Sequence, residues 1–541
     1  MQAIYVLLVA LFVSMLLIPP LSRLAIALGI TDRPDARKIH TRVTPRTGGI
    51  AIVIGTLIPV LLWAPMRADL HAYVLGAFVI FVFGILDDRL NLDYRLKLLG
   101  QVAAALIVTL VGGVLIQRVP LLGFDLLPFA LSLPLTVFVL VGLTNAVNLS
   151  DGLDGLAGGL SLLALGCLSV LAYQCGDSAA LMVVFAIMGA TFGFLRFNTN
   201  PAQIFMGDTG SQFLGFSTGV MALIVTQRPD TAVSALVPIL ILGLPILDTV
   251  NVMVRRIAEG RSPFSADRLH LHHQLLALGW SQYQAVVAIY IAQAVLILLA
   301  YVFRYSADLA LALIYVGFSI LMLVGIEALS RRGSRADAGA ESRVLDDDPD
   351  DRRLLEAIEG FLARWSSRLL SFVVPLVLVG GALAAPDVGS DIGVLTSLLL
   401  AQLLVGLWLT PRWRFWSERL AAYVIAVAVV YFLYETSMMD VHGRLVMFVF
   451  GLLGVAIALW VRFSNVDFNV STLDILILIV AVVVPSLSAS WYARFGWLAL
   501  GVIILFYAIE VLMSDARGKS LWLRLSVAAA LGILAIKGFL D

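Results

Sequence analysis

The sequence contains little charge. Only 13% of its 541 residues are Asp, Glu, Lys or Arg, whereas soluble globular proteins have about 25%. A further 61% are hydrophobic, and these residues stand in long uninterrupted runs. The shortage of charge excludes a soluble enzyme, and the apolar content excludes a disordered scaffold. We therefore expect an integral membrane protein.

Cysteine and net charge are also scarce. The chain has two cysteines, Cys167 and Cys175, in or beside one apolar segment, so neither a disulfide framework nor a thiolate metal site is expected. Basic and acidic residues number 36 each, so no bulk electrostatic field would recruit nucleic acid. The first apolar segment lacks a basic leader region and a small-residue cleavage site, and it is interpreted as a retained helix rather than a signal peptide.

The apolar runs predict an all-α polytopic fold. They lack the alternating pattern of barrel strands, and each approaches the roughly 20 residues that a spanning helix needs. We expect eighteen spans, near 3–22, 48–66, 72–87, 97–117, 128–146, 156–175, 178–196, 212–227, 234–254, 282–303, 308–329, 369–386, 391–410, 418–434, 443–461, 471–489, 493–513 and 520–539.

One polar stretch divides these spans into two groups. Residues 330–366 begin as a mixed-charge segment and continue with apolar residues on one helical face, which is typical either of a helix at the membrane surface or of an ordinary linker helix. We expect a domain of about 11 helices at 1–329, a cytoplasmic linker with an amphipathic helix at 330–366, and a membrane domain of about seven helices at 367–541.

Lysine and arginine residues predict the orientation. One set of loops in the first domain carries fourteen of them and the opposite set carries four, so the first set is expected in the cytoplasm and the N-terminus outside. The fourteen are Arg23, Arg33, Arg37, Lys38, Arg42, Arg46, Arg89, Arg95, Lys97, Arg196, Arg255, Arg256, Arg261 and Arg268; the four are Arg67, Arg118, Arg228 and Arg304.

Five polar segments interrupt the apolar pattern, and all five fall on the expected cytoplasmic face. They are DRPDARKIH with PRTGG (32–49), GILDD (84–88), NAVNLSDGLDG (145–155), NTNPAQIFMGDTGS (198–211) and SPFSADRLHLHH (262–273). Ionisable residues at membrane depth are costly, so their gathering on one face predicts one shared site.

The residue types in these segments restrict the chemistry. Asp87, Asp88, Asp151, Asp154 and Asp208 offer the hard oxygen ligands that Mg²⁺ or Mn²⁺ prefers. Histidines, Arg268 and Lys38 can donate to phosphate oxygens, and glycine-rich turns at helix starts expose backbone N–H groups. Together they indicate phosphoryl transfer between a charged soluble donor and a lipid phosphate.

Over about residues 1–329, the order of these motifs resembles the polyprenyl-phosphate N-acetylhexosamine-1-phosphate transferase superfamily, the WecA/MraY-like glycosyltransferase family 4. The DD pair, NAVNLSDGLDGLAGG, FNTNPAQIFMGDTGS and DRLHLHH carry the resemblance. The interrupted His270-Leu271-His272-His273 run resembles the WecA-type branch, because the MraY branch carries three contiguous histidines. Ser150, where the family often has Thr or Ile, leaves the carboxylate spacing unchanged.

The resemblance implies a reaction and its partners. A UDP-N-acetylhexosamine such as UDP-GlcNAc would donate its sugar 1-phosphate to undecaprenyl phosphate, releasing UMP and priming a surface polysaccharide such as the lipopolysaccharide O-antigen. It further implies Mg²⁺ (with Mn²⁺ as an alternative), a bacterial inner-membrane location with a cytoplasmic active site, and, by analogy only, a homodimer. The sequence does not indicate which hexosamine is used.

The resemblance also implies roles for individual residues. Asp87 is either the base or an electrostatic or ligand group, because a phosphate monoester is already largely ionised near pH 7. Asp248 fits a family pattern and also fits a structural buried hydrogen bond. The implied catalytic residues are Asp87, Asp88, Asp208, Arg268, His270, His272 and His273, the substrate-binding residues are Lys38, Asn148, Asp151, Asp154, Asn198 and Phe205, and the metal ligands are Asp208, Asp87 and Asp88.

Other functions also use aspartates in membrane helices, but they expect different patterns. A membrane prenyltransferase expects DDxxD-like spacing, whereas the pair here continues as Asp87-Asp88-Arg89-Leu90-Asn91. A CDP-alcohol phosphotransferase needs spaced aspartates that do not follow Asp154. A lipid-linked sugar flippase on a transferase-like scaffold is the main alternative. Residues 367–541 match no motif, so they form a structural or partner-binding module, a transporter of the lipid product, or a second enzyme.

Overall fold

The protein is almost entirely helical. The computed structural model describes residues 2–32, 43–119, 126–228, 231–262, 269–339, 349–386, 388–406, 411–435, 438–463, 471–486, 491–514 and 520–540. Within these ranges, eleven helices are long and apolar enough to cross a membrane. The strands β1 (Thr31–Asp32) and β2 (Thr44–Pro45) pair in antiparallel fashion, with Thr31 opposite Pro45. The predicted all-α polytopic fold is confirmed.

Contacts divide the chain into two compact units. The first comprises Met1–Glu341 together with Ser471–Leu487, and the second comprises Ser342–Val470 and Ser488–Asp541. This division follows packing, whereas the expected boundaries at 330 and 367 follow polarity, so the three-part domain organisation stays a prediction. A segment of the C-terminal region nevertheless packs with the N-terminal helices.

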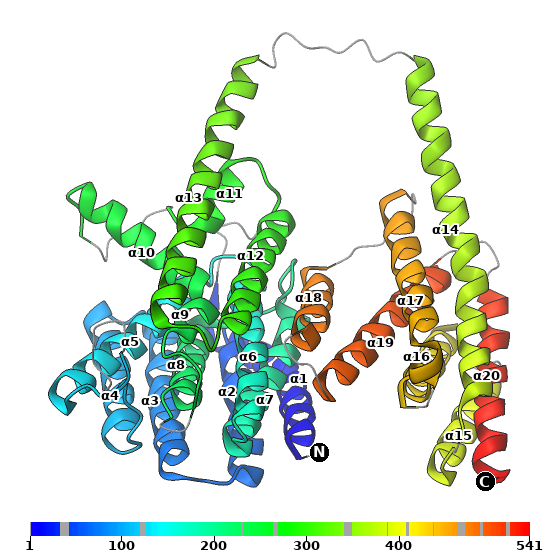
Figure 1. Ribbon diagram of the computed structural model, residues 1–541, viewed down its shortest axis with the longest axis horizontal. Helices are drawn as coiled ribbons and strands as arrows, with labels where there is room; N and C mark the ends of the chain where they lie inside the picture. Colours follow the sequence, from blue (N-terminus) through cyan, green and yellow to red (C-terminus); the bar gives the residue numbers. More distant parts are fainter. Residues whose placement is uncertain are drawn as a thin grey trace. The chain divides into compact units, whose positions relative to one another are not determined.

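The first unit is built from fourteen described helices (Figure 1). They are α1 (Gln2–Leu28), α2 (Gly48–Trp63), α3 (Ala68–Leu90), α4 (Tyr94–Leu110), α5 (Phe129–Leu149), α6 (Leu156–Gln174), α7 (Ser178–Asn198), α8 (Gly207–Thr226), α9 (Val237–Ile241), α10 (Gly243–Ala258), α11 (Leu271–Ala277), α12 (Gln282–Val302), α13 (Asp308–Gly339) and α18 (Thr472–Ser486).

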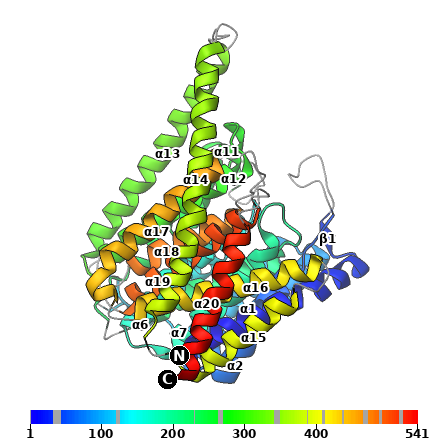
Figure 2. The same ribbon diagram turned by 90° about the vertical axis from the view of Figure 1, so that its right-hand side faces the viewer.

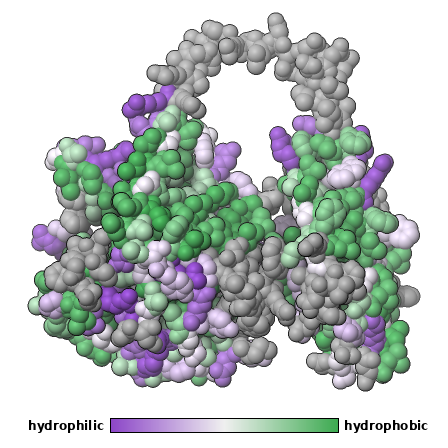
Figure 3. Space-filling model, in the orientation of Figure 1, coloured by the Kyte–Doolittle hydropathy of each residue, from purple (hydrophilic) through white to green (hydrophobic). Residues whose placement is uncertain are grey.

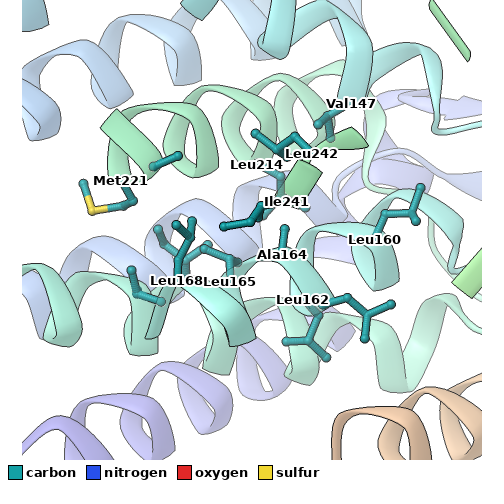
Figure 4. Close-up of a cluster of buried hydrophobic side chains, with 14 of the residues drawn as sticks. Val147, Leu160, Leu162, Ala164, Leu165, Leu168, Leu214, Met221, Ile241 and Leu242 are labelled. Atoms are coloured by element: carbon teal, nitrogen blue, oxygen red, sulfur yellow. The ribbon is translucent and has the colours of Figure 1, made fainter. Parts of the chain in front are cut away.

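The core of the first unit surrounds α6 and α8. Both helices are buried on nearly all sides, because other helices enclose them. Leu165 and Leu168 of α6 lie near Leu214 and Met221 of α8, with Ile241 of α9 beside them (Figure 4). This rigid pair carries the polar segments at residues 150–155 and 207–211 on its ends.

The span expected near 234–254 is wrong as a single helix. The structure has two helices there, α9 and α10, separated at Leu242. Pro245 lacks the backbone N–H that would bond to the Ile241 carbonyl, so the helical ladder breaks. The Gln293 side-chain amide donates to that carbonyl instead, at 2.6 Å. The short helix α11 was also not expected from the sequence.

The second unit contains α14 (Pro349–Ala384), α15 (Ser390–Gly406), α16 (Pro411–Glu435), α17 (Met438–Phe463), α19 (Trp491–Ser514) and α20 (Ser520–Leu540) (Figure 2). The amphipathic segment and the following span, expected as separate helices, are one helix, α14. Neither glycine nor proline occurs between Trp365 and Pro375, so no residue there ends the helix.

Two ion pairs join helices within the described part of the second unit. Arg419 of α16 lies 2.8 Å from Glu510 of α19, which also accepts a hydrogen bond from the Tyr423 hydroxyl. Arg524 of α20 lies 3.0 Å from Glu418. Pairing reduces the cost of holding charge within apolar helices.

Large apolar side chains face outward on both units, as Figure 3 shows in green. Leu16, Phe138 and Leu321 are each more than 70% exposed, at 76%, 74% and 72%. Exposed apolar area on this scale would aggregate in water, whereas lipid accommodates it. The chain is a multi-pass membrane protein.

Candidate active site

The first turn of α8 lies at the centre of the site because glycines let two helices approach it closely. A Cβ atom at Gly49 would lie 2.2 Å from the Gly210 nitrogen, and one at Gly84 would lie 2.5 Å from the Thr209 Cα. Only glycine permits these crossings of α2 and α3 with α8. The Gly48 and Gly49 amides also donate to the Phe205 and Met206 carbonyls, both at 2.9 Å, so the starts of α2 and α8 form one rigid assembly.

Asp88 holds the start of α8. Its Oδ1 accepts from the Asp208 amide at 2.8 Å, and its Oδ2 accepts from the Thr209 amide at 3.0 Å and the Thr209 hydroxyl at 2.6 Å. A carboxylate at this position satisfies amides that the helix leaves unpaired and interacts favourably with its dipole. The structure thus gives Asp88 an anchoring function, while its predicted role as a metal ligand stays a prediction.

Lys97 joins two of the predicted carboxylates. Its Nζ lies 2.6 Å from Oδ2 of Asp87 and 3.2 Å from Oδ2 of Asp208. The Asp87 side chain is buried, and its Oδ1 accepts from the Leu92 amide at 3.0 Å. From the sequence, Lys97 is expected at the start of a span and has no predicted role. The sequence feature that could have identified Lys97 is a lysine in the first turn of an apolar helix, four residues after the helix-capping Asp93.

The second oxygen of Asp208 is also fixed. The Asn148 amide donates to Asp208 Oδ1 at 2.7 Å and to the Ser211 hydroxyl at 3.0 Å. Asn148 and Lys97 therefore orient the Asp208 carboxylate, whose side chain is one-third exposed toward a cavity. Ser211, on the same turn as Asp208, is a second site residue that the sequence analysis did not assign.

Asp154 and Asn198 form hydrogen bonds that connect the loop at 150–155 with the loop at 198–205. Asp154 accepts from the Asn200 side chain at 2.9 Å and from the Ala202 amide at 3.0 Å. Asn198 accepts from the Gly155 amide at 3.0 Å and donates to the Ile204 carbonyl at 2.8 Å. Both residues line the cavity, but these bonds show that they also shape its wall.

Asp151 faces the cavity among other acidic groups. Its recessed position, followed by repulsion from Asp208, Asp88 and Asp154, raises the pKa of Asp151 to about 7. The side chain remains accessible to solvent through the cavity. An accumulation of negative charge that faces an opening is an arrangement that a bound cation would relieve.

The three predicted histidines have different surroundings. His270 is buried, and its Nδ1 lies 2.9 Å from Asp248, which also accepts from the Leu271 amide at 2.7 Å. Asp248 thus makes the buried hydrogen bonds that its structural interpretation expects. His272 lies against the loop after α5, where a Cβ at Gly152 would come within 2.2 Å of its Nε2.

His272 is neutral at physiological pH. Burial, followed by the adjacent His273 and His270, lowers the pKa of His272 to about 3. Of the three histidines, His273 lines the cavity. Lys38 and Arg268 lie outside the described residues.

The cavity has a volume of about 680 Å³, within the range of small-molecule sites. Its wall includes the predicted Phe205 and two residues without a predicted role, Arg46 and Gln282. Arg46 pairs with Asp32 at 3.0 Å. The lining consists of Asp32, Thr44, Arg46, Asp88, Asn148, Asp151, Gly152, Leu153, Asp154, Asn198, Asn200, Pro201, Ala202, Phe205, Gly207, Asp208, Ser211, His273 and Gln282.

Carboxylates outnumber cations in this lining. Five aspartates face one arginine among the described residues of the wall. The described part of the chain holds no group of three His, Cys, Asp or Glu side chains spaced to bind a metal by themselves. Mg²⁺ is commonly held by one or two carboxylates and completed by substrate phosphates and water, so Asp208 and Asp151 with the Asn148 amide nearby remain a fitting donor set.

Comparison with known proteins finds a family model and several relatives that match this chain. A family model described as glycosyl transferase family 4 matches residues 70–226, the range that holds Asp87, Asp151 and Asp208. A Bacillus subtilis (strain 168) protein named as a probable undecaprenyl-phosphate N-acetylglucosaminyl 1-phosphate transferase is 39% identical over 320 residues, which cover 58% of this chain and 88% of that protein.

Two further relatives carry similar names. An undecaprenyl-phosphate alpha-N-acetylglucosaminyl 1-phosphate transferase of Yersinia pestis is 30% identical over 283 residues, 51% of this chain and 77% of the relative. A decaprenyl-phosphate N-acetylglucosaminephosphotransferase of Mycolicibacterium smegmatis is 36% identical over 301 residues, 50% of this chain and 74% of the relative.

Proposed function

Because the chain belongs to the WecA/MraY-like family of polyprenyl-phosphate sugar-1-phosphate transferases, we propose that it transfers N-acetylhexosamine 1-phosphate from a UDP-sugar to undecaprenyl phosphate. An oxygen of the lipid phosphate attacks the β-phosphorus, which carries the sugar. The bond from that phosphorus to the bridging oxygen breaks, and the electron pair leaves with UMP. The lipid-linked product would prime a surface polysaccharide.

The observation that carries this proposal is the cavity in front of the first turn of α8. Asp208 stands there with both oxygens oriented, and Lys97 and Asn148 lie within hydrogen-bond distance of them. Phosphoryl transfer depends mostly on positioning and charge stabilisation, and this arrangement supplies both.

Mg²⁺ is the metal that we propose for the site. Asp208 and Asp151 would hold it, and when bound it would neutralise charge on the diphosphate. The acidic excess of the wall supports this assignment, since a diphosphate is anionic and five aspartates would otherwise repel it. Mn²⁺ has similar ligand preferences and is the alternative.

Lys97 and Asp87 act as a pair in this proposal. Asp87 is buried beside Lys97, so its carboxylate holds the ammonium group next to the cavity-lining Asp208 rather than facing the substrate itself. The Lys97 Nζ can then donate to a phosphate oxygen that displaces it from Asp208. This geometry favours the electrostatic alternative for Asp87 over its role as base.

Uridine binding would use the wall formed by the loops 150–155 and 198–205. Phe205 offers an aromatic face for a nucleobase, while Asp154 and Asn198 keep the two loops at a fixed separation. The excess of lysine and arginine in the loops on this side supports a cytoplasmic face for the site, where UDP-sugars occur, with the N-terminus outside the bacterial inner membrane.

A UMP-release assay on the purified full-length chain tests the proposal. UDP-GlcNAc, UDP-GalNAc and 6-deoxy analogues would be supplied with undecaprenyl phosphate and Mg²⁺, and each component would be omitted in turn. We expect release that requires the lipid, the UDP-sugar and the metal, and that stops with EDTA and resumes with added Mg²⁺.

Two results would contradict parts of this proposal. Release that persists in EDTA would overturn the metal assignment. The protein's folding would be verified by its thermal transition. If the folded protein released no UMP with any donor, the transferase proposal would be overturned, and transport of a lipid-linked sugar would become the favoured function.

A further inference from the structure

One helix of the C-terminal region is a structural part of the first unit. α18 stands in the sequence between α17 and α19, which both belong to the second unit. It nevertheless contacts α12 and α6, and its Leu473, Leu476 and Val483 are buried in the core of the first unit. A helix that served only to connect α17 with α19 would not be expected to bury these three side chains in the core of the first unit.

The start of α18 has a fixed geometry. The Asp474 carboxylate accepts from the Ser471 amide at 2.7 Å and from the Ser471 hydroxyl at 2.8 Å, while the Asp474 amide donates to that hydroxyl at 3.3 Å. Reciprocal bonds of this kind define the first residue of a helix. They place the buried Thr472 at the end of α18 that faces the loop before α6.

Gly155 is the point where this loop meets α18. Its φ of +81° lies in the left-handed region, and a Cβ there would lie 3.4 Å from the Tyr290 hydroxyl and 3.6 Å from Thr472 Oγ1. Its amide donates to Asn198, and its carbonyl accepts from the Tyr290 hydroxyl at 2.8 Å. Gly155 therefore has the cavity loop on one side and Tyr290 with Thr472 on the other.

The same helix that carries Tyr290 also reaches the cavity directly. Gln282, the first residue of α12, lines the cavity and accepts from Asn200 at 2.9 Å. α12 thus supports the cavity wall at Gly155 and at Asn200. α18 packs against α12 and against α6, the helix that begins directly after Gly155.

We infer that α18 is a positioning element of the transferase site. By packing against both α6 and α12, it maintains the contact between Tyr290 and Gly155 and so fixes the loop Asp151–Gly155 that lines the cavity. A segment of the C-terminal extension is then needed for the shape of the N-terminal site. The activity consequence rests on the proposed function, whereas the structural consequence does not.

A matched pair of substitutions in the full-length chain tests the inference. Leu476→Ala removes a side chain that is 0% exposed, and Leu478→Ala removes the same atoms from a side chain that is 40% exposed on the same helix. We expect the amides of residues 151–160 to exchange with deuterium about tenfold faster in Leu476→Ala and at the wild-type rate in Leu478→Ala. Peptides from α1 and α7 report whether the fold is retained.

The activity readout separates the two proposals. In the UMP-release assay, we expect Leu476→Ala to raise the KM for the UDP-sugar about tenfold while the KM for the lipid changes little. Wild-type protein without activity, combined with faster exchange only in Leu476→Ala, would overturn the proposed function and support the role of α18. Active wild-type protein with identical exchange in both variants would overturn the role of α18.

A milder variant covers the case in which Leu476→Ala does not fold. Leu476→Val removes one methylene-sized group from the same buried position. Faster exchange confined to residues 151–160 would support the inference, and an unchanged exchange rate in this folded variant would contradict it.

Discussion

The two ends of α6 lie beside carboxylates in opposite electrostatic settings. At one end, Asp177 lies 3.0 Å from Arg67 and 2.7 Å from Arg228, and it accepts from the Ala180 amide at 2.9 Å. At the other end, Asp151 and Asp208 share a cavity with further aspartates. Protein groups compensate Asp177, and Lys97 and Asn148 compensate Asp208, whereas Asp151 faces mainly other carboxylates.

The pKa values follow this difference. Burial raises the pKa of Asp177, but the Arg67 bond, the Ala180 amide and Arg228 outweigh it and hold this pKa below its usual value. Burial and neighbouring carboxylates instead raise the pKa of Asp151 to about 7. A carboxylate that is paired with protein cations stabilises the fold, whereas a carboxylate that faces a cavity without such a partner is available to a ligand. Four substitutions test this contrast.

The largest expected effect is the loss of activity in Asp208→Asn. The substitution preserves shape and can retain the bond from Asn148 but removes the charge that faces the cavity. We expect UMP release to fall by about 10³-fold, with an unchanged melting temperature. Asp93→Asn is the control, because Asp93 is an exposed helix cap on the same end of the molecule and Asn also caps. Substantial activity in Asp208→Asn would refute its assignment as the metal ligand.

Lys97→Met should have the next largest effect. It removes the ammonium group that lies between Asp87 and Asp208 and leaves the two carboxylates facing each other. We expect kcat to fall by about 10²-fold and Lys97→Arg to restore part of it. A steady-state measurement in which only the KM for UDP-sugar changes would show that Lys97 serves binding rather than the transfer step.

Asp177→Asn should change stability and leave activity intact. It leaves Arg67 and Arg228 without their shared partner, and we expect a loss of about 2 kcal/mol in unfolding free energy. Because the pKa of Asp177 is lowered in the folded state, its contribution is complete above about pH 4 and is lost as pH falls through the folded pKa. Thermal unfolding at pH 7 and pH 5 should therefore show the same deficit. A deficit that grows between these values would contradict the assignment.

Asp151→Asn should give the smallest effect, with the opposite sign. A raised carboxyl pKa means that the folded state retains a proton that the unfolded chain has lost, so Asp151 reduces stability as pH rises from about 4 to about 7. Without Mg²⁺ we expect the variant to melt above wild type at pH 8 and together with it at pH 4. A variant that is less stable than wild type at pH 8 would show that Asp151 is compensated like Asp177.

Much of the site could be predicted from the sequence, because charged residues are costly inside apolar membrane helices and therefore gather at their ends. Asp88, the pair Asp151 and Asp154, and Asp208 stand in three separate segments, and the structure brings them to one cavity. Counting membrane crossings placed those segments on one face, since each spanning helix reverses the side of the next loop. The break at Leu242 was missed because Pro245 and Gln293 act together, and their pairing is not visible along the chain.

Individual roles were less predictable than positions. Asp88 was expected as a ligand, but its oxygens accept from the first amides of α8. Lys97 and Arg46 were noted as basic residues of loops and helix starts, and only the packing of α4 and β2 brought them to carboxylates. Partner choice for a charged side chain depends on distances between helices, which periodicity does not specify.

The sequence alone determined that this protein is a helical membrane protein with acidic motifs of a sugar-phosphate transferase, because apolar length and local motif chemistry are properties of short segments. The tertiary structure decided which carboxylates are compensated and which face the cavity. It also assigned α18 to the first unit, although more than 130 residues separate this helix from α13. Packing of a buried apolar face depends on the complementary surface of other helices, and a segment's own sequence does not reveal which surface that is.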